Sequence, residues 1–349
     1  MYLRDSNPTL THVTISNNTA EDDGGGMLLY TSNPTLAHVT ITDNSAVIGG
    51  GGMATYNSSP ILTNVIISNN IISDSYCEFS NEVDADFCRG GGMLIVGEGE
   101  GSFPVFTNVT ISNNEAYRGG GLYFWEVSNH YATDFWVPLT FSKLTISKNK
   151  SRYGSAIFSA YSNIHLNQVT ITENEAVEGL EWSNGTIEYI PSYSLPMCFL
   201  ITNSIVWNNT VEEYLGFVDN DCYPEIYNSL FSEETSASFF DGNGVIDSGE
   251  EPQFTDPDNG DYTLMEGSPC IDTGTADIDG DGVDDITDFI GSDPDMGAYE
   301  FGESSEIMFG DTNFDGIVDI LDIVRIVNQI MGNSEFNDDE FTAADFNAD

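Results

Sequence analysis

The chain contains 349 residues, of which 57 are acidic and 8 are basic, so its formal net charge is -49. Its hydrophobic fraction of 40% is high enough for a folded core, which argues against a disordered acidic tail. With so few basic residues, we expect neither nucleic acid nor an anionic membrane surface as a partner. No stretch reaches the roughly 20 apolar residues that a membrane-spanning helix needs.

A repeat with a period of about 26 residues begins at the N-terminus. Each copy reads approximately Asn-Pro-Thr-Leu-x-x-Val-Thr-Ile-Ser-Asn-Asn, and the clearest copies are residues 7–18, 33–44, 59–70 and 103–114. A Gly-Gly-Gly-Met element lies between the copies, at residues 24–27, 50–53 and 90–93. Met1 aligns with Met27 in the middle of a unit, so we expect the repeat array to be truncated at its N-terminus.

The pattern inside one repeat predicts short strands separated by corners. Val13 and Ile15 alternate with polar neighbours, as in a strand that buries one face. Leu10 does not fit this alternation, which indicates a bend between Leu10 and the strand that contains Val13 and Ile15. Asn17 and Asn18 favour a sharp turn, because asparagine tolerates left-handed backbone angles. With a further corner at the glycines, three strands and three corners predict one coil of a parallel β-helix.

Equivalent residues of successive coils should stack at a spacing of roughly 4.8 Å. The predicted buried columns are Val13, Val39, Val65 and Val109, and Ile15, Ile41, Ile67 and Ile111. The predicted asparagine ladder contains Asn18, Asn44, Asn70 and Asn114. A further column contains His12, His38, Asn64, Asn108, Lys143 and Gln168. Because this last position accepts varied polar residues, we expect it to face solvent; a two-histidine metal site is the alternative.

These motifs resemble the right-handed β-helix repeats of bacterial surface and secreted proteins. The Gly-Gly-Gly-Met and Thr-Ile-Ser-Asn-Asn elements are also similar to paired motifs of chlamydial polymorphic outer-membrane proteins. The resemblance implies a mainly β chain with a right-handed parallel β-helix over residues 1–232, located outside the cell or on its surface. It leaves the function open, because this scaffold carries lyases, hydrolases and passive adhesins.

Insertions in the repeat carry aromatic residues and cysteines. Residues 126–137 are rich in aromatic side chains, which could stack on sugars or cover an exposed edge. In an extracellular protein we expect disulfides. Cys77 and Cys88 lie in one insertion, and Cys198 and Cys222 lie about one coil apart, so these are the expected pairs. Cys270 is expected to be a small buried side chain rather than a nucleophile.

Residues 233–302 form the second predicted domain, in which acidic turns replace the repeat. The motifs at residues 267–274 and 295–301 resemble the closing segment that follows β-helices in choice-of-anchor surface proteins. That resemblance implies a cap over the last open coil, which would hide its unpaired strand edge.

An acidic loop at residues 277–288 lies between these two motifs. Its carboxylates occupy loop positions 1, 3, 5, 9 and 12, contributed by Asp277, Asp279, Asp281, Asp285 and Asp288. Gly282 stands at position 6, and Val283 offers its carbonyl at position 7. This spacing is typical of an EF-hand-like loop, so we expect calcium here.

Residues 303–349 contain a second loop of this type, followed by apolar residues at helical spacing. The expected ligands are Asp311, Asn313, Asp315, the Ile317 carbonyl, Asp319 and Asp322. A loop followed by one helix resembles a type I dockerin repeat. Asp345, Asn347 and Asp349 begin a second loop that the chain does not complete, so we expect a C-terminally truncated module. The resemblance implies a cohesin-like or cell-surface partner, without establishing one.

The sequence leaves two functions open. The regular coils favour a non-catalytic adhesive, structural or carbohydrate-binding stalk that carries a calcium-dependent docking module. The dockerin resemblance also permits a polysaccharide lyase or glycoside hydrolase. The scarcity of arginine and lysine argues against a uronate lyase, whereas paired carboxylates of a glycoside hydrolase are not visible in a sequence.

Overall fold

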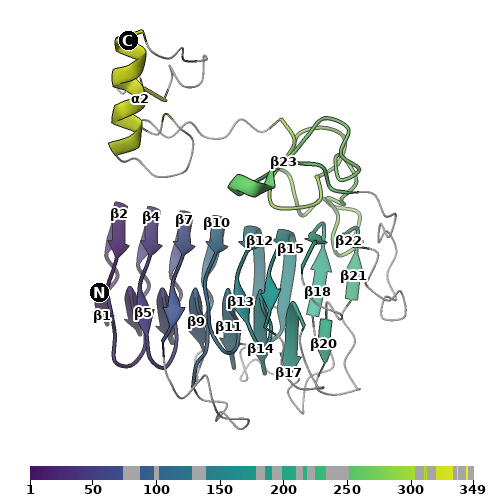
Figure 1. Ribbon diagram of the computed structural model, residues 1–349. Helices are drawn as coiled ribbons and strands as arrows, with labels where there is room; N and C mark the ends of the chain where they lie inside the picture. The colour runs from purple at the N-terminus through teal and green to yellow at the C-terminus, as the bar shows by residue number, and fades with distance from the viewer. Residues whose placement is uncertain are drawn as a thin grey trace. The chain divides into compact units, whose positions relative to one another are not determined.

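The computed structural model describes residues 1–73, 87–97, 102–127, 139–177, 185–190, 199–209, 215–217, 225–232, 251–302 and 320–332, with residues 310, 312, 336, 343 and 344. The chain divides into two compact units, Met1–Phe301 and Gly302–Asp349. The first unit contains a long stack of parallel strands, and the described part of the second contains the helix at residues 320–330 (Figure 1). No helix in these described stretches is long and apolar enough to cross a membrane.

Two long parallel sheets form the coils of the first unit. In spatial order, sheet A contains β1 (Tyr2–Arg4), β3 (Met27–Tyr30), β6 (Met53–Tyr56), β9 (Met93–Val96), β11 (Leu122–Trp125), β14 (Ile157–Ala160), β17 (Ile187–Ile190) and β20 (Leu215–Phe217). Sheet B contains β2 (Thr9–Ser16), β4 (Thr35–Thr42), β7 (Ile61–Ser68), β10 (Val105–Ser112), β12 (Leu139–Ser147), β15 (Ile164–Thr172), β18 (Phe199–Thr202) and β21 (Glu225–Tyr227), joined by β19 (Ile205–Trp207) and β22 (Leu230–Phe231). Because strands of the two sheets alternate along the chain, the architecture is the predicted parallel β-helix.

Short strands after sheet B add a third parallel strip to the coils. They pair as β5 (Ser45–Ala46) with β8 (Ile71–Ile72), and β13 (Lys150–Ser151) with β16 (Glu175–Ala176). The core fills the interior with aliphatic and aromatic side chains from both long sheets, including Leu29, Ile67 and Phe124, none of which is exposed. Side chains alternate between this interior and the outside, as the sequence predicted.

The predicted columns are confirmed by the strand register. Val13 pairs with Val39, Val39 with Val65, and Val65 with Val109. The predicted asparagine ladder is also formed, and it continues through Asn149, Asn174 and Asn209. Each buried amide bridges two coils: Asn44 Nδ2 donates to Asn70 Oδ1 at 3.0 Å and to the Ile15 carbonyl at 2.9 Å.

The corners of the coil are left-handed, which explains the residue types found there. Asn17 (φ 58°) and Gly24 (φ 69°) occupy two of them, as predicted. The bend expected near Leu10 lies instead at His12 (φ 54°), inside a strand that runs continuously from Thr9 to Ser16. A fourth left-handed position follows sheet A, at Thr31 (φ 49°) and its equivalents. The coil therefore has one more left-handed corner than the sequence indicated.

The histidine column is only partly exposed to solvent. His12 is exposed and stacks on His38, with 4.7 Å between the ring centroids. Gln168, which continues the column, is buried. The prediction of a uniformly solvent-facing column is therefore wrong, because residues from the end of the first unit cover its later members.

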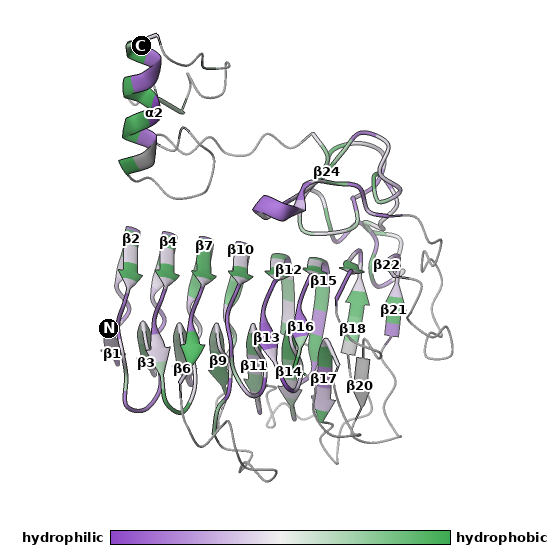
Figure 2. Ribbon diagram, viewed as in Figure 1, coloured by the Kyte–Doolittle hydropathy of each residue, from purple (hydrophilic) through white to green (hydrophobic). Residues whose placement is uncertain are grey.

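We call residues 251–301 the closing segment. It contains the antiparallel pair β23 (Phe254–Asp256) and β24 (Asp261–Leu264), with the short 3-10 helix η2 (Pro257–Asn259) between them. Figure 2 shows η2 as strongly hydrophilic. Apolar side chains of the closing segment pack with two outward-facing residues of the β-helix; the cluster contains Ile205, Leu230, Phe254, Tyr262, Leu264, Cys270 and Met296.

Residues 233–302 were expected to cap the last open coil. Residues 251–301 lie along the outside of sheet B, beside β12, β15 and β19 (Figure 1). The physical reason is the apolar surface that Ile205 and Leu230 present on that flank, which gives the segment a place to bury its own apolar residues. Residues 233–250, which directly follow the last coil, lie outside the described residues.

In the second unit, the predicted helix is present as α2 (Ile320–Ile330). Its apolar residues are widely exposed, from 43% at Val327 to 78% at Ile330. Asp322 on the same helix is buried, and its Oδ1 accepts the Thr312 backbone N–H at 2.8 Å.

A candidate metal centre in the closing segment

The acidic loop is tied to the β-helix at its first residues. Thr275 donates its backbone N–H to Asn203 Oδ1 at 2.8 Å, and its carbonyl accepts Asn203 Nδ2 at 2.9 Å. The loop then closes on itself, because the Asp285 N–H donates to the Ala276 carbonyl at 2.8 Å. Gly280 and Gly282 take left-handed angles inside it, as glycine readily does.

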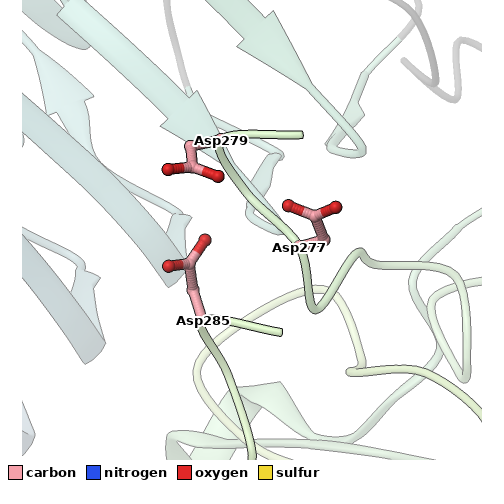
Figure 3. A group of neighbouring side chains, drawn as sticks. All are labelled: Asp277, Asp279 and Asp285. Atoms are coloured by element: carbon pink, nitrogen blue, oxygen red, sulfur yellow. The ribbon is translucent and has the colours of Figure 1, made fainter. Parts of the chain in front are cut away.

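This closure brings three of the predicted ligands together. Carboxylate oxygens of Asp277, Asp279 and Asp285 all lie within 4.8 Å of one another. Figure 3 shows the three side chains converging from two parts of the loop. Asp279 and Asp285 are exposed and Asp277 is half-buried. Three converging carboxylates repel each other and present only oxygen donors, so the arrangement could bind a hard cation.

The loop backbone already orients Asp277. Its Oδ1 accepts the Gly280 N–H at 2.8 Å, and its Oδ2 accepts the Gly282 N–H at 2.8 Å. The Ile278 N–H donates to Asp285 Oδ2 at 2.9 Å. The first and ninth loop positions are therefore held in place by hydrogen bonds of the chain itself, which lowers the ordering cost of binding an ion.

The other three predicted ligands of this loop are not part of the cluster. Asp281 Oδ1 accepts the Val283 N–H at 2.8 Å, so these two residues form a local turn. Asp288 pairs instead with Lys143 of β12, with 3.0 Å between Nζ and Oδ2. Roles for Asp281, the Val283 carbonyl and Asp288 remain predictions.

The second predicted loop is described only at its last ligand. Asp322 receives a hydrogen bond from Thr312, which follows the first predicted ligand in the sequence, so position 12 is close to the start of the loop. The remaining predicted ligands lie outside the described residues: Asp311, Asn313, Asp315, Ile317, Asp319, Asp345, Asn347 and Asp349.

Two buried acids of the closing segment were not singled out by the sequence. Asp295 Oδ1 accepts the Asp272 N–H at 2.7 Å, and Glu300 Oε1 accepts the Asp295 N–H at 3.1 Å and Gln168 Nε2 at 3.0 Å. Burial raises the pKa of both carboxyls, while these backbone hydrogen bonds oppose the increase. By accepting these backbone N–H groups, Asp295 and Glu300 stabilise turns of the closing segment. In the sequence, the only sign of this role was that both acids belong to the motif at residues 295–301.

A further buried acid lies on the face of sheet A opposite to the core. Glu188 of β17 is 1% exposed and stands next to Phe158 of β14 in the register. Burial raises its pKa to about 8, while hydrogen bonds from the Gly185 and Gly154 backbones and the charge of Arg118 favour the ionised form. A carboxyl that is protonated near neutral pH can donate a proton.

The cysteines agree with the predictions where they are described. Cys88 is disulfide-bonded and buried, and its partner lies outside the described residues, as do Cys77, Cys198 and Cys222. Cys270 is a free and fully buried thiol, as expected. Burial raises its pKa to about 12, so it is not an activated nucleophile. Of the aromatic insertion, residues 128–138 also lie outside the described part.

Comparison with known proteins bears on the β-helix. Residues 1–76 match the family model described as "Right handed beta helix region". The crystal structure of pectate lyase Pel9A is similar with a TM-score of 0.41 and 11% sequence identity, over 82% of this chain and 72% of that chain. No curated protein matches the chain. The stacked parallel coils and the family match over residues 1–76 agree on a right-handed β-helix fold for sheets A and B.

Proposed function

We propose that the chain is a calcium-binding β-helix protein of the cell surface or the extracellular space. In this proposal the β-helix is a non-catalytic stalk with an adhesive, structural or carbohydrate-binding role, and the second unit is a docking module. The observation that carries the proposal is the convergence of Asp277, Asp279 and Asp285 in one loop.

Calcium suits these three residues better than other common metal ions. It takes six to eight oxygen ligands in flexible geometry, whereas zinc and copper prefer nitrogen or sulfur. The triad offers carboxylate oxygens alone. The strongly negative chain also attracts divalent cations.

Isothermal titration of the full chain with calcium tests this proposal. We expect Asp277→Asn with Asp285→Asn to remove one binding event, because both changes keep side-chain size and remove charge. Asp293→Asn is the matched control, since Asp293 is an exposed acid of the same segment outside the triad. Unchanged binding in the double variant would refute the site.

The second loop requires its own variant in the same titration. Asp311→Ala with Asp315→Ala should remove a different binding event and leave the first one intact. Loss of both events in this variant would contradict two independent sites. Loss of neither would show that the dockerin-like loop does not bind calcium.

The exposed apolar residues of α2 support a docking role for the second unit. Ile320, Ile323, Val324, Val327 and Ile330 repeat at helical spacing and are all exposed. We propose a cohesin-like or other cell-surface protein as the partner. In binding assays against a panel of cohesin domains, Val324→Glu with Val327→Glu should abolish any binding that the unaltered chain shows. Glutamate variants that bind equally well would contradict this role.

The enzymatic alternative is a polysaccharide lyase or hydrolase on the same scaffold, and Glu188 is the observation that favours it. Burial raises the pKa of Glu188 to about 8, so its carboxyl holds a proton at neutral pH as a general acid must, against the opposing charge of Arg118. Assays over a panel of uronate and neutral polysaccharides separate the two functions. Turnover that is lost in Glu188→Gln supports the enzyme, whereas binding of a polysaccharide without turnover supports the stalk.

A further inference from the structure

The distribution of basic residues singles out one coil of the β-helix. All lysines of the chain lie between residues 143 and 150, in β12, β13 and the corner between them. The closing segment, in contrast, is rich in aspartate and contains neither lysine nor arginine. The most acidic described segment of the first unit therefore lies against its most basic coil.

Two of these lysines hold the closing segment directly. Lys143 Nζ is 3.0 Å from Asp288 Oδ2. Lys148 Nζ donates to the Pro257 carbonyl at 2.9 Å and to the Asp258 carbonyl at 3.1 Å. Both lysine side chains are largely shielded from solvent, whereas Asp288 is 74% exposed, so salt should screen the Lys143–Asp288 pair.

The next coil contributes two further polar contacts. Glu173 Oε2 accepts the hydroxyl of Tyr262 at 2.7 Å and lies 3.6 Å from Lys148 Nζ. Gln168 Nε2 donates to Glu300 Oε1 at 3.0 Å. Side chains of β12, of β15 and of the corners that follow them thus contact the closing segment between Pro257 and Glu300.

The backbone at these contact residues is unusual for their type. Lys143, Lys148, Gln168 and Glu173 all occupy left-handed corners, with φ between 49° and 56°. In the preceding coils, the equivalent left-handed positions contain His12, His38, Asn64, Asn108, Asn17, Asp43, Asn69 and Asn113. Short polar residues tolerate this conformation better than long side chains do. The left-handed backbone at these corners does not favour lysine, glutamine or glutamate. We therefore attribute the presence of these long side chains to their contacts with the closing segment.

We propose that Lys143, Lys148, Gln168 and Glu173 form a docking site that holds the closing segment as a strap on the flank of sheet B. Charge and hydrogen bonds hold the strap over β12 and β15, and the apolar cluster around Ile205 and Leu230 anchors it at the following coils. Among the polar side chains beside the strap, Thr170 Oγ1 accepts the Ala298 N–H at 3.0 Å, and buried His165 lies close enough to Asp285 to interact with its charge.

Hydrogen exchange of the full chain, followed by mass spectrometry in the presence of a calcium chelator, tests the strap. Lys143→Asn with Lys148→Asn gives the corners a residue that suits left-handed angles while removing the contacts. We expect exchange in residues 257–264 and 288–300 to accelerate at least tenfold. Exchange in β4 and β7 should not change, and modification of His165 by diethyl pyrocarbonate should increase.

Lys150→Asn is the matched control, because Lys150 lies in the same coil and pairs with Glu175 at 3.1 Å on the third strip. It should leave exchange in the closing segment unchanged. Raising the salt concentration from 0.1 to 1 M should accelerate exchange in the unaltered strap, since screening weakens the ion pairs.

Three outcomes would overturn the proposal. The first is unchanged protection of the closing segment in the double variant. The second is equal deprotection by Lys150→Asn. The third is accelerated exchange throughout the β-helix core, which would show that the lysines support the coils rather than the strap. Because the chelator is present throughout, none of these outcomes depends on calcium binding.

Discussion

At the scale of single residues, polar side chains have two structural roles in the coil: they occupy left-handed corners, and asparagine amides join neighbouring coils. The asparagine ladder was predictable, since a residue that recurs at every coil must stack on itself. The left-handed corner at His12 was not, because histidine is a less distinctive signal than asparagine or glycine. Glu188 was equally hidden, because its burial depends on sheet register rather than on its neighbours in the sequence.

Asn70→Ala tests the ladder. Asn70 Oδ1 accepts both the backbone N–H and the side-chain Nδ2 of Asn44, and its own Nδ2 donates to Asn114 and to the Ile41 carbonyl. Removing the amide leaves buried groups unsatisfied, so the free energy of unfolding should fall by about 3 kcal/mol. Asn18→Ala, at the exposed end of the ladder, should cost clearly less. Urea denaturation followed by circular dichroism measures both, and equal losses would contradict the ladder's role.

The pH dependence of stability tests the burial of Glu188. Burial raises the pKa of folded Glu188 to about 8, well above the 4.5 of an ordinary glutamate, so the folded state holds the proton more tightly than the unfolded state does. Stability contributed by the protonated form is present below pH 4.5 and is lost as the pH rises through 8. At pH 9 the unaltered chain buries a charged carboxylate and the glutamine variant does not. Glu188→Gln should therefore raise the free energy of unfolding more at pH 9 than at pH 5, with a difference of a few kcal/mol at most. If the substitution changed the free energy of unfolding equally at both pH values, burial would not raise the pKa of Glu188.

At the scale of elements, the repeat determines the strands, and the glycine triplets determine how closely neighbouring coils approach. The register of β4 with β7 followed directly from the sequence period. The placement of the closing segment did not follow, because its contacts join residues more than a hundred positions apart, such as Lys148 with Pro257. A resemblance to closing segments predicted a cap, whereas the apolar flank at Ile205 and Leu230 directs it to the side of sheet B.

Gly50→Ala tests the corner at the glycine triplet. Gly50 has a φ of 61°, and a Cβ there would lie 2.3 Å from the Met53 carbonyl oxygen. Gly260 shares the left-handed angle, with φ 86°, but its Cβ would meet nothing within 4 Å. Gly260→Ala should therefore cost only the conformational penalty of about 1 kcal/mol, and Gly50→Ala should cost several times more. Similar losses in thermal denaturation would mean that the neighbouring backbone relaxes freely.

At the scale of the whole molecule, the chain combines a right-handed β-helix, an acidic closing segment and a separate helical unit. The fold class was predictable from the sequence, because the repeat has a fixed period, and the loop spacing singled out Asp277, Asp279 and Asp285, whose carboxylates the structure places close together. The pairing of Asp288 with Lys143 was not readable, because it depends on where the closing segment docks.

The most direct test of the central proposal is an anomalous difference map from crystals of the chain grown with calcium. We predict a peak about 2.4 Å from carboxylate oxygens of Asp277, Asp279 and Asp285, the usual calcium–oxygen distance. The same map from Asp277→Asn with Asp285→Asn should lack this peak. A map with no peak at the triad in the unaltered chain, at a calcium concentration of several millimolar, would contradict the proposed site.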